Sequence, residues 1–262
     1  MKLLQGKPAY YLAIGLFILT IALNYLSATG IIFPYNQAEI SDYYANYLAP
    51  AGFTFSIWGL IYLGMTLSLA LPAFGQLSTW EKQVYFQEVM PRYLPWLLAN
   101  SLWIILWSFD WIALALLAIL AYTYSLIRLV AYLEHVGPLR PLLHWSLVLP
   151  LGLHAGWLTF ASYTNVMTLL VKWGFAGLSS SGALLTVVLM VLASLSVLAL
   201  FRRYHNPAVT LPALWALYGI FTKQMAGNQL VKWSALILGL LALAGHIWIY
   251  LKGKNIINND LQ

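Results

Sequence analysis

The sequence predicts an all-α integral membrane protein built as an eight-helix transmembrane bundle, and three observations support this prediction. Of the 262 residues, 62% are apolar and only 8% are charged, whereas soluble domains carry about 25% charged residues. The apolar residues form long runs, many of them near the length of about 20 residues that crosses a bilayer. Most charged residues lie between these runs. The composition therefore excludes both a soluble globular domain and a disordered chain.

Eight apolar runs follow one another along the chain, and each is predicted to be helical because a lone strand would leave its amides unpaired in lipid. The runs cover residues 8–33, 52–74, 93–109, 111–133, 144–170, 182–201, 207–221 and 231–251. Turn-forming residues separate them, for example Pro34 after the first run, Gly75 after the second and Gly137-Pro138 before the fifth. The seventh run begins at Pro207 and is the shortest.

The positive charges test this count of spans. If the N-terminus lies on side one, that side carries Lys2, Lys7, Lys82, Arg92, Arg128, Arg140, Arg202, Arg203, Lys252 and Lys254. The opposite side carries only Lys172, Lys223 and Lys232. Because Lys and Arg accumulate in cytoplasmic loops, this asymmetry predicts that both termini are cytoplasmic.

The sequence provides no catalytic residues and no metal ligands. It contains no Cys, which excludes disulfides, thiolate metal sites and cysteine nucleophiles. No carboxylate pair lies within a span, and HExxH, Walker and GxSxG motifs are absent. The formal net charge of +6 is spread through short loops. It therefore reflects membrane topology rather than a nucleic-acid partner.

Three of the runs carry large aromatic side chains on one helical face, at spacings of three and four residues. These stripes are Phe55, Trp58 and Tyr62 in the second run, Asn100, Trp103 and Trp107 in the third, and His154, Trp157, Ala161 and Asn165 in the fifth. Such faces could line a mostly apolar cavity for a flat hydrophobic ligand. From the pattern alone, however, ordinary packing between helices or anchoring at the membrane interface is the more common explanation of such stripes.

Other polar residues have simpler interpretations. Asp110 lies in a very short turn and is expected to be the N-cap of the fourth helix. Asn24 and Ser27 are one turn apart on the first helix and are expected to form hydrogen bonds to neighbouring helices. Glu39 and Asp42 are expected to lie in a solvated loop between the first two spans.

At these clusters the chain resembles the tryptophan-rich sensory protein family (TspO/MBR, related to the translocator or peripheral benzodiazepine receptor protein). Trp58-Gly59-Leu60-Ile61-Tyr62 resembles its second-helix signature, and Asn100-Ser101-Leu102-Trp103 resembles its third-helix signature. Trp157-Leu158-Thr159-Phe160-Ala161, followed by Asn165, resembles its fifth-helix signature. The segment 50–64 is similar to a longer bacterial branch of the family.

The resemblance implies a five-helix core over residues 1–172 and three additional transmembrane helices over 173–262. It also implies a pocket between helices that binds porphyrins, sterols or other lipophiles, in the inner (plasma) membrane of a bacterium. Two positions depart from the family pattern: Phe53 lies near the usual entrance Trp, and His154 replaces an aromatic hydroxyl. The predicted ligand-binding residues are Phe53, Phe55, Trp58, Tyr62, Asn100, Trp103, Trp107, His154, Trp157, Ala161 and Asn165.

The favoured hypothesis is a sensor or carrier that binds a tetrapyrrole or a sterol-like molecule. No cofactor is required, although a porphyrin or haem is an expected ligand. The expected partners are the lipid bilayer and a lipophilic small molecule, a homodimer is compatible with the sequence, and nucleic acid is not expected. The alternatives are a secondary transporter, a porphyrin-modifying enzyme that uses His154, and a scaffold whose aromatic stripes serve only packing.

Overall fold

The computed structural model describes residues 5–75 and 77–259, with side chains described as far as residue 252. Within these ranges the chain is helical and contains no strand. Two of the positive charges used to predict orientation, Lys2 and Lys254, lie outside the described side chains.

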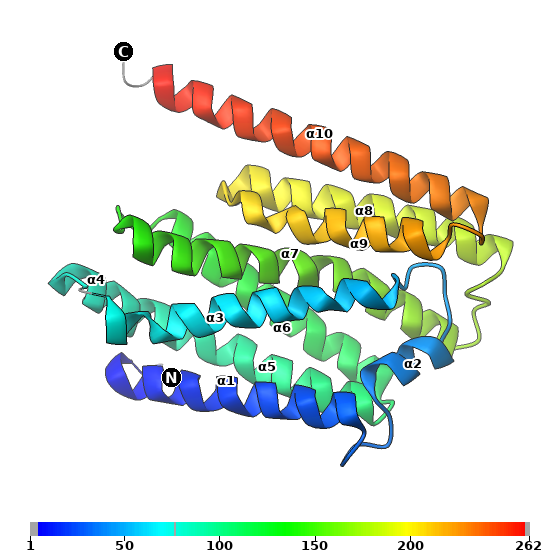
Figure 1. The fold of residues 1–262 in the computed structure, drawn as a ribbon, viewed down its shortest axis with the longest axis horizontal. Helices are drawn as coiled ribbons and strands as arrows, with labels where there is room; N and C mark the ends of the chain where they lie inside the picture. Colours follow the sequence, from blue (N-terminus) through cyan, green and yellow to red (C-terminus); the bar gives the residue numbers. More distant parts are fainter. Residues whose placement is uncertain (1–4, 76, 260–262) are drawn as a thin grey trace.

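The helices run up and down along one axis, and the start of α1 and the end of α10 lie at the same end of the bundle (Figure 1). The elements are α1 (Gly6–Thr29), α2 (Gln37–Tyr43), η1 (Gly52–Ser56), α3 (Ile57–Phe74), α4 (Thr79–Gln83), η2 (Val84–Val89), α5 (Met90–Ser108), α6 (Ile112–Glu134), α7 (Pro141–Lys172), α8 (Ser180–Tyr204), η3 (Pro207–Val209), α9 (Leu211–Lys223) and α10 (Gln229–Asn259). Each predicted apolar run falls on one of the longer helices.

Five helical segments in the described part of the chain are long and apolar enough to cross a membrane. They are Gly6–Thr29, Gly52–Phe74, Ile112–Glu134, Ser180–Tyr204 and Gln229–Lys252. Among the other long helices, α9 has 13 residues, and α5 and α7 carry more polar side chains, including Asn100 and His154. A helix surrounded by other helices needs less apolar surface than one that faces lipid. The presence of membrane-spanning helices is therefore supported, whereas the count of eight spans stays a prediction.

The helix α7 occupies the centre of the bundle. It packs against α3 and α6 on one side and against α8, η3 and α9 on the other. Gly156 permits the closest of these approaches, because a Cβ atom there would lie 1.9 Å from the Val209 carbonyl oxygen. The last three long helices are consequently packed directly onto the helix that carries the fifth aromatic stripe.

Polar contacts between helices confirm one prediction and correct another. Asn24 donates to the Tyr62 hydroxyl at 2.6 Å, and Ser27 and Ser108 share a hydrogen bond of 2.7 Å, as expected for helix-bridging groups. Asp110, however, is not the N-cap of α6. Its backbone has a φ of 59° in the tight turn between α5 and α6, and its carboxylate instead pairs with Lys172 at 2.8 Å.

The segment after α1 also differs from the expected loop. The first helix ends at Thr29, where Gly30 adopts the left-handed conformation that terminates helices. Residues 37–43 then form α2, whose N-terminus is closed by reciprocal hydrogen bonds between Asn36 and Glu39. Glu39 therefore belongs to a helix cap rather than to an irregular loop.

Candidate ligand-binding site

The α5 wall of the candidate site consists of two indoles one helical turn apart. The rings of Trp103 and Trp107 are separated by 5.5 Å between centroids. Trp103 Nε1 donates to Asn165 Oδ1 of α7 at 3.0 Å, and Trp107 Nε1 donates to the Gln37 carbonyl oxygen of α2 at 3.3 Å. Both indole N–H groups are thus satisfied, and each ties α5 to a different neighbour.

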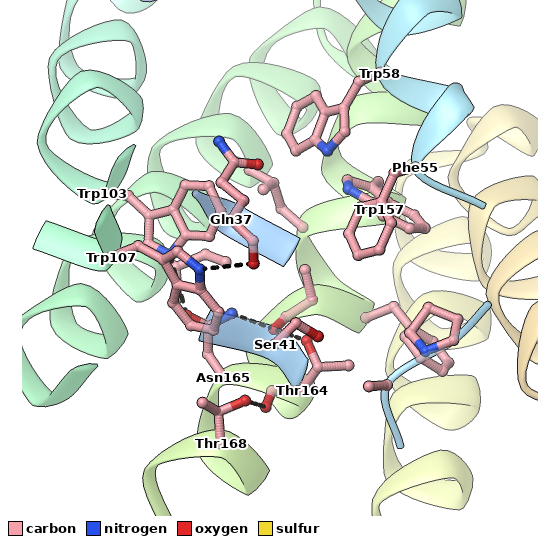
Figure 2. A pocket seen from close by; sticks show the side chains of 16 residues that line it. Gln37, Ser41, Phe55, Trp58, Trp103, Trp107, Trp157, Thr164, Asn165 and Thr168 are labelled. Carbon is pink, nitrogen blue, oxygen red and sulfur yellow. Dashed lines mark hydrogen bonds between the residues drawn. The ribbon is translucent and has the colours of Figure 1, made fainter. Parts of the chain in front are cut away.

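The opposite wall is built by η1, α3 and α7. Trp157 meets Phe55 edge to face at 6.1 Å and meets Trp58 edge to face at 6.3 Å. This geometry is the one that aromatic quadrupoles favour. Figure 2 shows these three rings facing Trp103 and Trp107, with Gln37 and Ser41 of α2 between the two walls.

A mostly apolar cavity of about 70 Å³ lies between these walls. It is lined by Gln37, Ser41, Ala49, Pro50, Phe55, Trp58, Trp103, Trp107, Ile119, Trp157, Leu158, Phe160, Ala161, Thr164, Asn165 and Thr168. One water takes about 30 Å³ of liquid volume, whereas pockets for drug-sized ligands span about 300–1,000 Å³. The cavity in this conformation fits only small guests, so a tetrapyrrole requires the walls to move apart.

The cavity brings together seven of the residues predicted from the sequence. These residues are Phe55, Trp58, Trp103, Trp107, Trp157, Ala161 and Asn165. The three aromatic stripes therefore converge on one space instead of facing three different directions. Whether these residues bind a ligand stays a prediction.

The other four predicted residues do not line this cavity. Phe53 is exposed and packs against Trp215 of α9, with ring centroids 5.3 Å apart. Tyr62 lies behind Trp58 and stacks on it at 5.3 Å.

Asn100 and His154 lie deeper in the protein. Asn100 is 1% exposed, and its Nδ2 has no hydrogen-bond partner among the described residues. His154 is fully buried, with its Nε2 hydrogen-bonded to the Tyr122 hydroxyl. Trp58 covers it edge-on at 5.5 Å. Both side chains therefore belong to the packed layer behind the cavity and do not line it.

A charged cluster connects α2 with the ends of α5 and α7. The Tyr44 hydroxyl donates to Asp110 Oδ2 at 3.0 Å, and the same carboxylate accepts the Lys172 ion pair. The pKa of Tyr44 is raised, mainly by burial and to a lesser extent by the hydrogen bond to Asp110 and the charge of that carboxylate. No group of three or more His, Cys, Asp or Glu side chains that could hold a metal ion occurs in the described part of the chain.

A comparison of the sequence with known protein families finds a match over most of the chain. A family described as "TSPO-like protein" matches residues 10–248. The chain belongs to the TSPO-like family. Family membership confirms the resemblance to tryptophan-rich sensory proteins that the sequence motifs indicated. No curated protein and no solved structure matches the chain.

The match to the TSPO-like family reaches well beyond the motifs that first indicated it. Those motifs lie between Trp58 and Asn165, whereas the matched residues continue into α10. The proposed boundary at residues 172 and 173 falls inside the match, and the division into two domains stays a prediction.

Sequence reasoning missed several residues that line the cavity of this TSPO-like chain. Gln37 and Ser41 lie in the segment that was expected to be a loop, although the Asn36–Glu39 pattern at its start is a recognisable helix-start signal. Thr164 and Thr168 extend the α7 stripe of Ala161 by successive steps of three and four residues, so the same periodicity could have found them.

Proposed function

We propose that the protein binds a flat lipophilic molecule, a tetrapyrrole or a sterol-like compound, between α2, α3, α5 and α7, and acts as a sensor or carrier. The convergence of four indoles on one mostly apolar cavity carries this proposal. A space enclosed by aromatic rings and a few polar groups suits a planar apolar ligand. Membership of the TSPO-like family supports the same class of ligand through the resemblance stated above.

Aromatic stacking and burial would provide most of the affinity. A favourable aromatic pair contributes about 0.5–1.5 kcal/mol beyond its buried area. Asn165 lines the cavity, and its Oδ1 accepts one hydrogen bond from Trp103, so the second lone pair of this oxygen could orient the ligand. A porphyrin or haem would be the ligand of this site rather than a resident cofactor.

The cavity can widen where α2 forms its wall. This helix has seven residues and contributes Gln37 and Ser41 to the lining. It is attached through the Trp107–Gln37 hydrogen bond and through Gln37 Nε2, which donates to Asn24 Oδ1 at 3.1 Å. Displacing one short helix costs fewer contacts than separating two long ones, so the ligand would enter beside α2.

The same proposal includes a topology in the membrane. All eight long helices would cross a bacterial inner membrane, with both termini in the cytoplasm. The start of α1 and the end of α10 lie at the same end of the bundle in Figure 1, which supports an even number of crossings. The excess of Lys and Arg on that side supports its cytoplasmic placement.

Titration of the purified protein with protoporphyrin, followed by quenching of Trp fluorescence, tests the binding site. We expect saturable quenching that detergent alone does not produce. Replacing Trp103 by Phe together with Asn165→Ala removes the indole–amide hydrogen bond, and we expect affinity to fall about tenfold.

Trp233→Phe provides the matched control, because Trp233 is 51% exposed on α10, away from the cavity. This variant should bind like the parent protein. Unsaturable quenching, or equal affinity in the parent and the Trp103→Phe/Asn165→Ala variant, contradicts the assignment of the site.

A further inference from the structure

A second, larger groove lies on the other side of α7. It runs between α6 and α8, with α7 as its floor, and has a volume of about 670 Å³. It shares no lining residue with the indole cavity. Its volume falls within the range of about 300–1,000 Å³ that is typical of ligand sites. The groove therefore has to be explained separately from the proposed porphyrin site.

The hydroxyl groups along this groove are already engaged within the protein. Thr123 and Ser162 share a hydrogen bond of 3.0 Å, and Tyr163 and Ser196 share one of 2.8 Å. Thr159 donates to the Ala155 carbonyl oxygen at 2.8 Å. Because these groups have partners, the walls offer hydrocarbon contacts and do not require a polar ligand. The occupant of the long part of the groove is accordingly a hydrocarbon chain.

One end of the groove carries two arginine–tyrosine pairs, one from each flanking helix. On α6, Arg128 Nη1 donates to the Tyr124 hydroxyl at 3.2 Å, and its guanidinium lies 5.9 Å from the Tyr124 ring centroid. On α8, the Arg203 guanidinium lies 5.4 Å from the Tyr204 ring centroid. Tyr124, Arg203 and Tyr204 line the groove, whereas Arg128 lies one turn after Tyr124 on α6 and reaches the groove through its contact with that residue.

These two guanidinium groups have no carboxylate partner among the described side chains. The nearest carboxylate in sequence to Arg128 is Glu134, and it is paired with His205 at 2.8 Å. Both arginines lie towards the C-terminal ends of membrane-spanning segments, where an anion stabilises a positive charge, and guanidinium binds phosphate through paired hydrogen bonds. The protein thus presents unpaired positive charge at the end of a hydrocarbon-lined groove.

We propose that this groove binds one anionic phospholipid, with an acyl chain along α7 and the phosphate at Arg128 and Arg203. The combination of a chain-lining groove and two free guanidinium groups selects a lipid over a free anion, and an anionic headgroup over a zwitterionic one. The site is independent of the proposed porphyrin cavity.

Native mass spectrometry of the full chain in detergent tests this proposal, with phosphatidylglycerol and phosphatidylcholine as probes. We expect one phosphatidylglycerol per chain to bind about tenfold more tightly than phosphatidylcholine. Arg128→Gln combined with Arg203→Gln should abolish this preference. Arg202→Gln removes one positive charge directly beside Arg203, at a residue that does not line the groove, and it should leave the preference unchanged.

A second pair of variants tests the acyl-chain part without altering charge. Ala199 is exposed and lines the groove, so Ala199→Phe fills it without disturbing a buried contact. We expect this variant to lose tight phosphatidylglycerol binding. The control Ala121→Phe adds the same ring at an exposed position of α6 that does not line this groove, and it should retain binding.

Three results overturn the proposal. The first is an unchanged lipid preference in the Arg128→Gln/Arg203→Gln variant, or an equal loss in Arg202→Gln. The second is tight phosphatidylglycerol binding by Ala199→Phe. The third is displacement of the lipid by millimolar inorganic phosphate, because a free anion would then suffice. Circular dichroism establishes that each variant retains the helical content of the parent.

Discussion

The buried carboxylate of Glu81 accepts hydrogen bonds at the N-termini of two helices, α4 and α7. It closes the N-terminus of α4 through reciprocal hydrogen bonds with Ser78. It also accepts from the backbone N–H of Arg140 at 3.0 Å and from Arg140 Nε at 2.8 Å, directly before α7. Burial opposes its charge, but the hydrogen bonds from Ser78 and Arg140 outweigh this effect and lower the pKa of Glu81 to about 2.

We expect Glu81→Gln to destabilise the protein at pH 7 by about 1–3 kcal/mol, because buried donors lose a charged acceptor. The folded-state pKa lies below the ordinary value of 4.5. The contribution of Glu81 is therefore complete above about pH 4.5 and is lost as the pH falls towards 2. Thermal unfolding in detergent at pH 7 and at low pH measures both effects.

Glu88→Gln is the matched control for this prediction. Glu88 pairs with Arg92 at 2.7 Å on a partly exposed helix surface, where such pairs contribute about 0–1 kcal/mol. Equal destabilisation by the two substitutions would show that burial and capping give Glu81 no special role.

The positions of individual aromatic residues could be predicted from helical periodicity, but their neighbours could not. Steps of three and four residues correctly grouped Trp103 with Trp107 and Trp157 with Ala161. The same steps also grouped His154 with Trp157, although His154 turns towards Tyr122 of α6. Periodicity defines a face about 100° wide, and only tertiary packing decides which edge of that face meets a cavity.

Among the elements, α7 determines how the first helices join the last three. Two glycines of α7 allow neighbouring segments to approach its backbone at positions where a larger side chain would not fit. Gly156 lies against the Val209 carbonyl of η3, and Gly152 lies against the Asn206 side chain. Asn206 Nδ2 in turn donates to the Val148 carbonyl oxygen of α7 at 2.8 Å.

We therefore expect Gly156→Ala to destabilise the protein by about 1–3 kcal/mol, since the added methyl group would overlap the Val209 carbonyl. Gly59→Ala on α3 is the control. A Cβ at Gly59 meets no atom within 4 Å, so this change should be neutral or stabilising by about 0.5–1 kcal/mol. Thermal unfolding of both variants in detergent measures the difference. A stable Gly156→Ala protein would mean that α7 and η3 do not approach as closely as described.

The long helices could be predicted from apolar length, whereas the short ones could not. The predicted run 111–133 agrees with α6, Ile112–Glu134, within one residue at each end. The agreement is close because the thickness of the bilayer sets the length of an apolar helix that crosses it. The helix α2 could not be predicted in this way, because its seven residues include Glu39 and Asp42 and contain no hydrophobic run. Its cap was the only available signal, and α2 contributes Gln37 and Ser41 to the cavity wall.

The whole molecule is expected to cross the membrane an even number of times, with the side that is rich in Lys and Arg in the cytoplasm. Reporter fusions test this expectation in cells. Alkaline phosphatase should be inactive when fused after residue 262 and active when inserted in the segment 173–179, because the enzyme folds only outside the cytoplasm. An active C-terminal fusion would contradict the proposed orientation or the count of eight spans.

The central claim is that the space enclosed by the indoles receives a flat lipophilic ligand. The most direct measurement is the dissociation constant for protoporphyrin of Ala161→Phe, which places a ring in the cavity, compared with Ala121→Phe on the exposed face of α6. We predict that the Ala161 variant loses binding by about tenfold or more, whereas the Ala121 variant binds like the parent. Equal affinity in both variants would contradict the assignment of the ligand to this cavity.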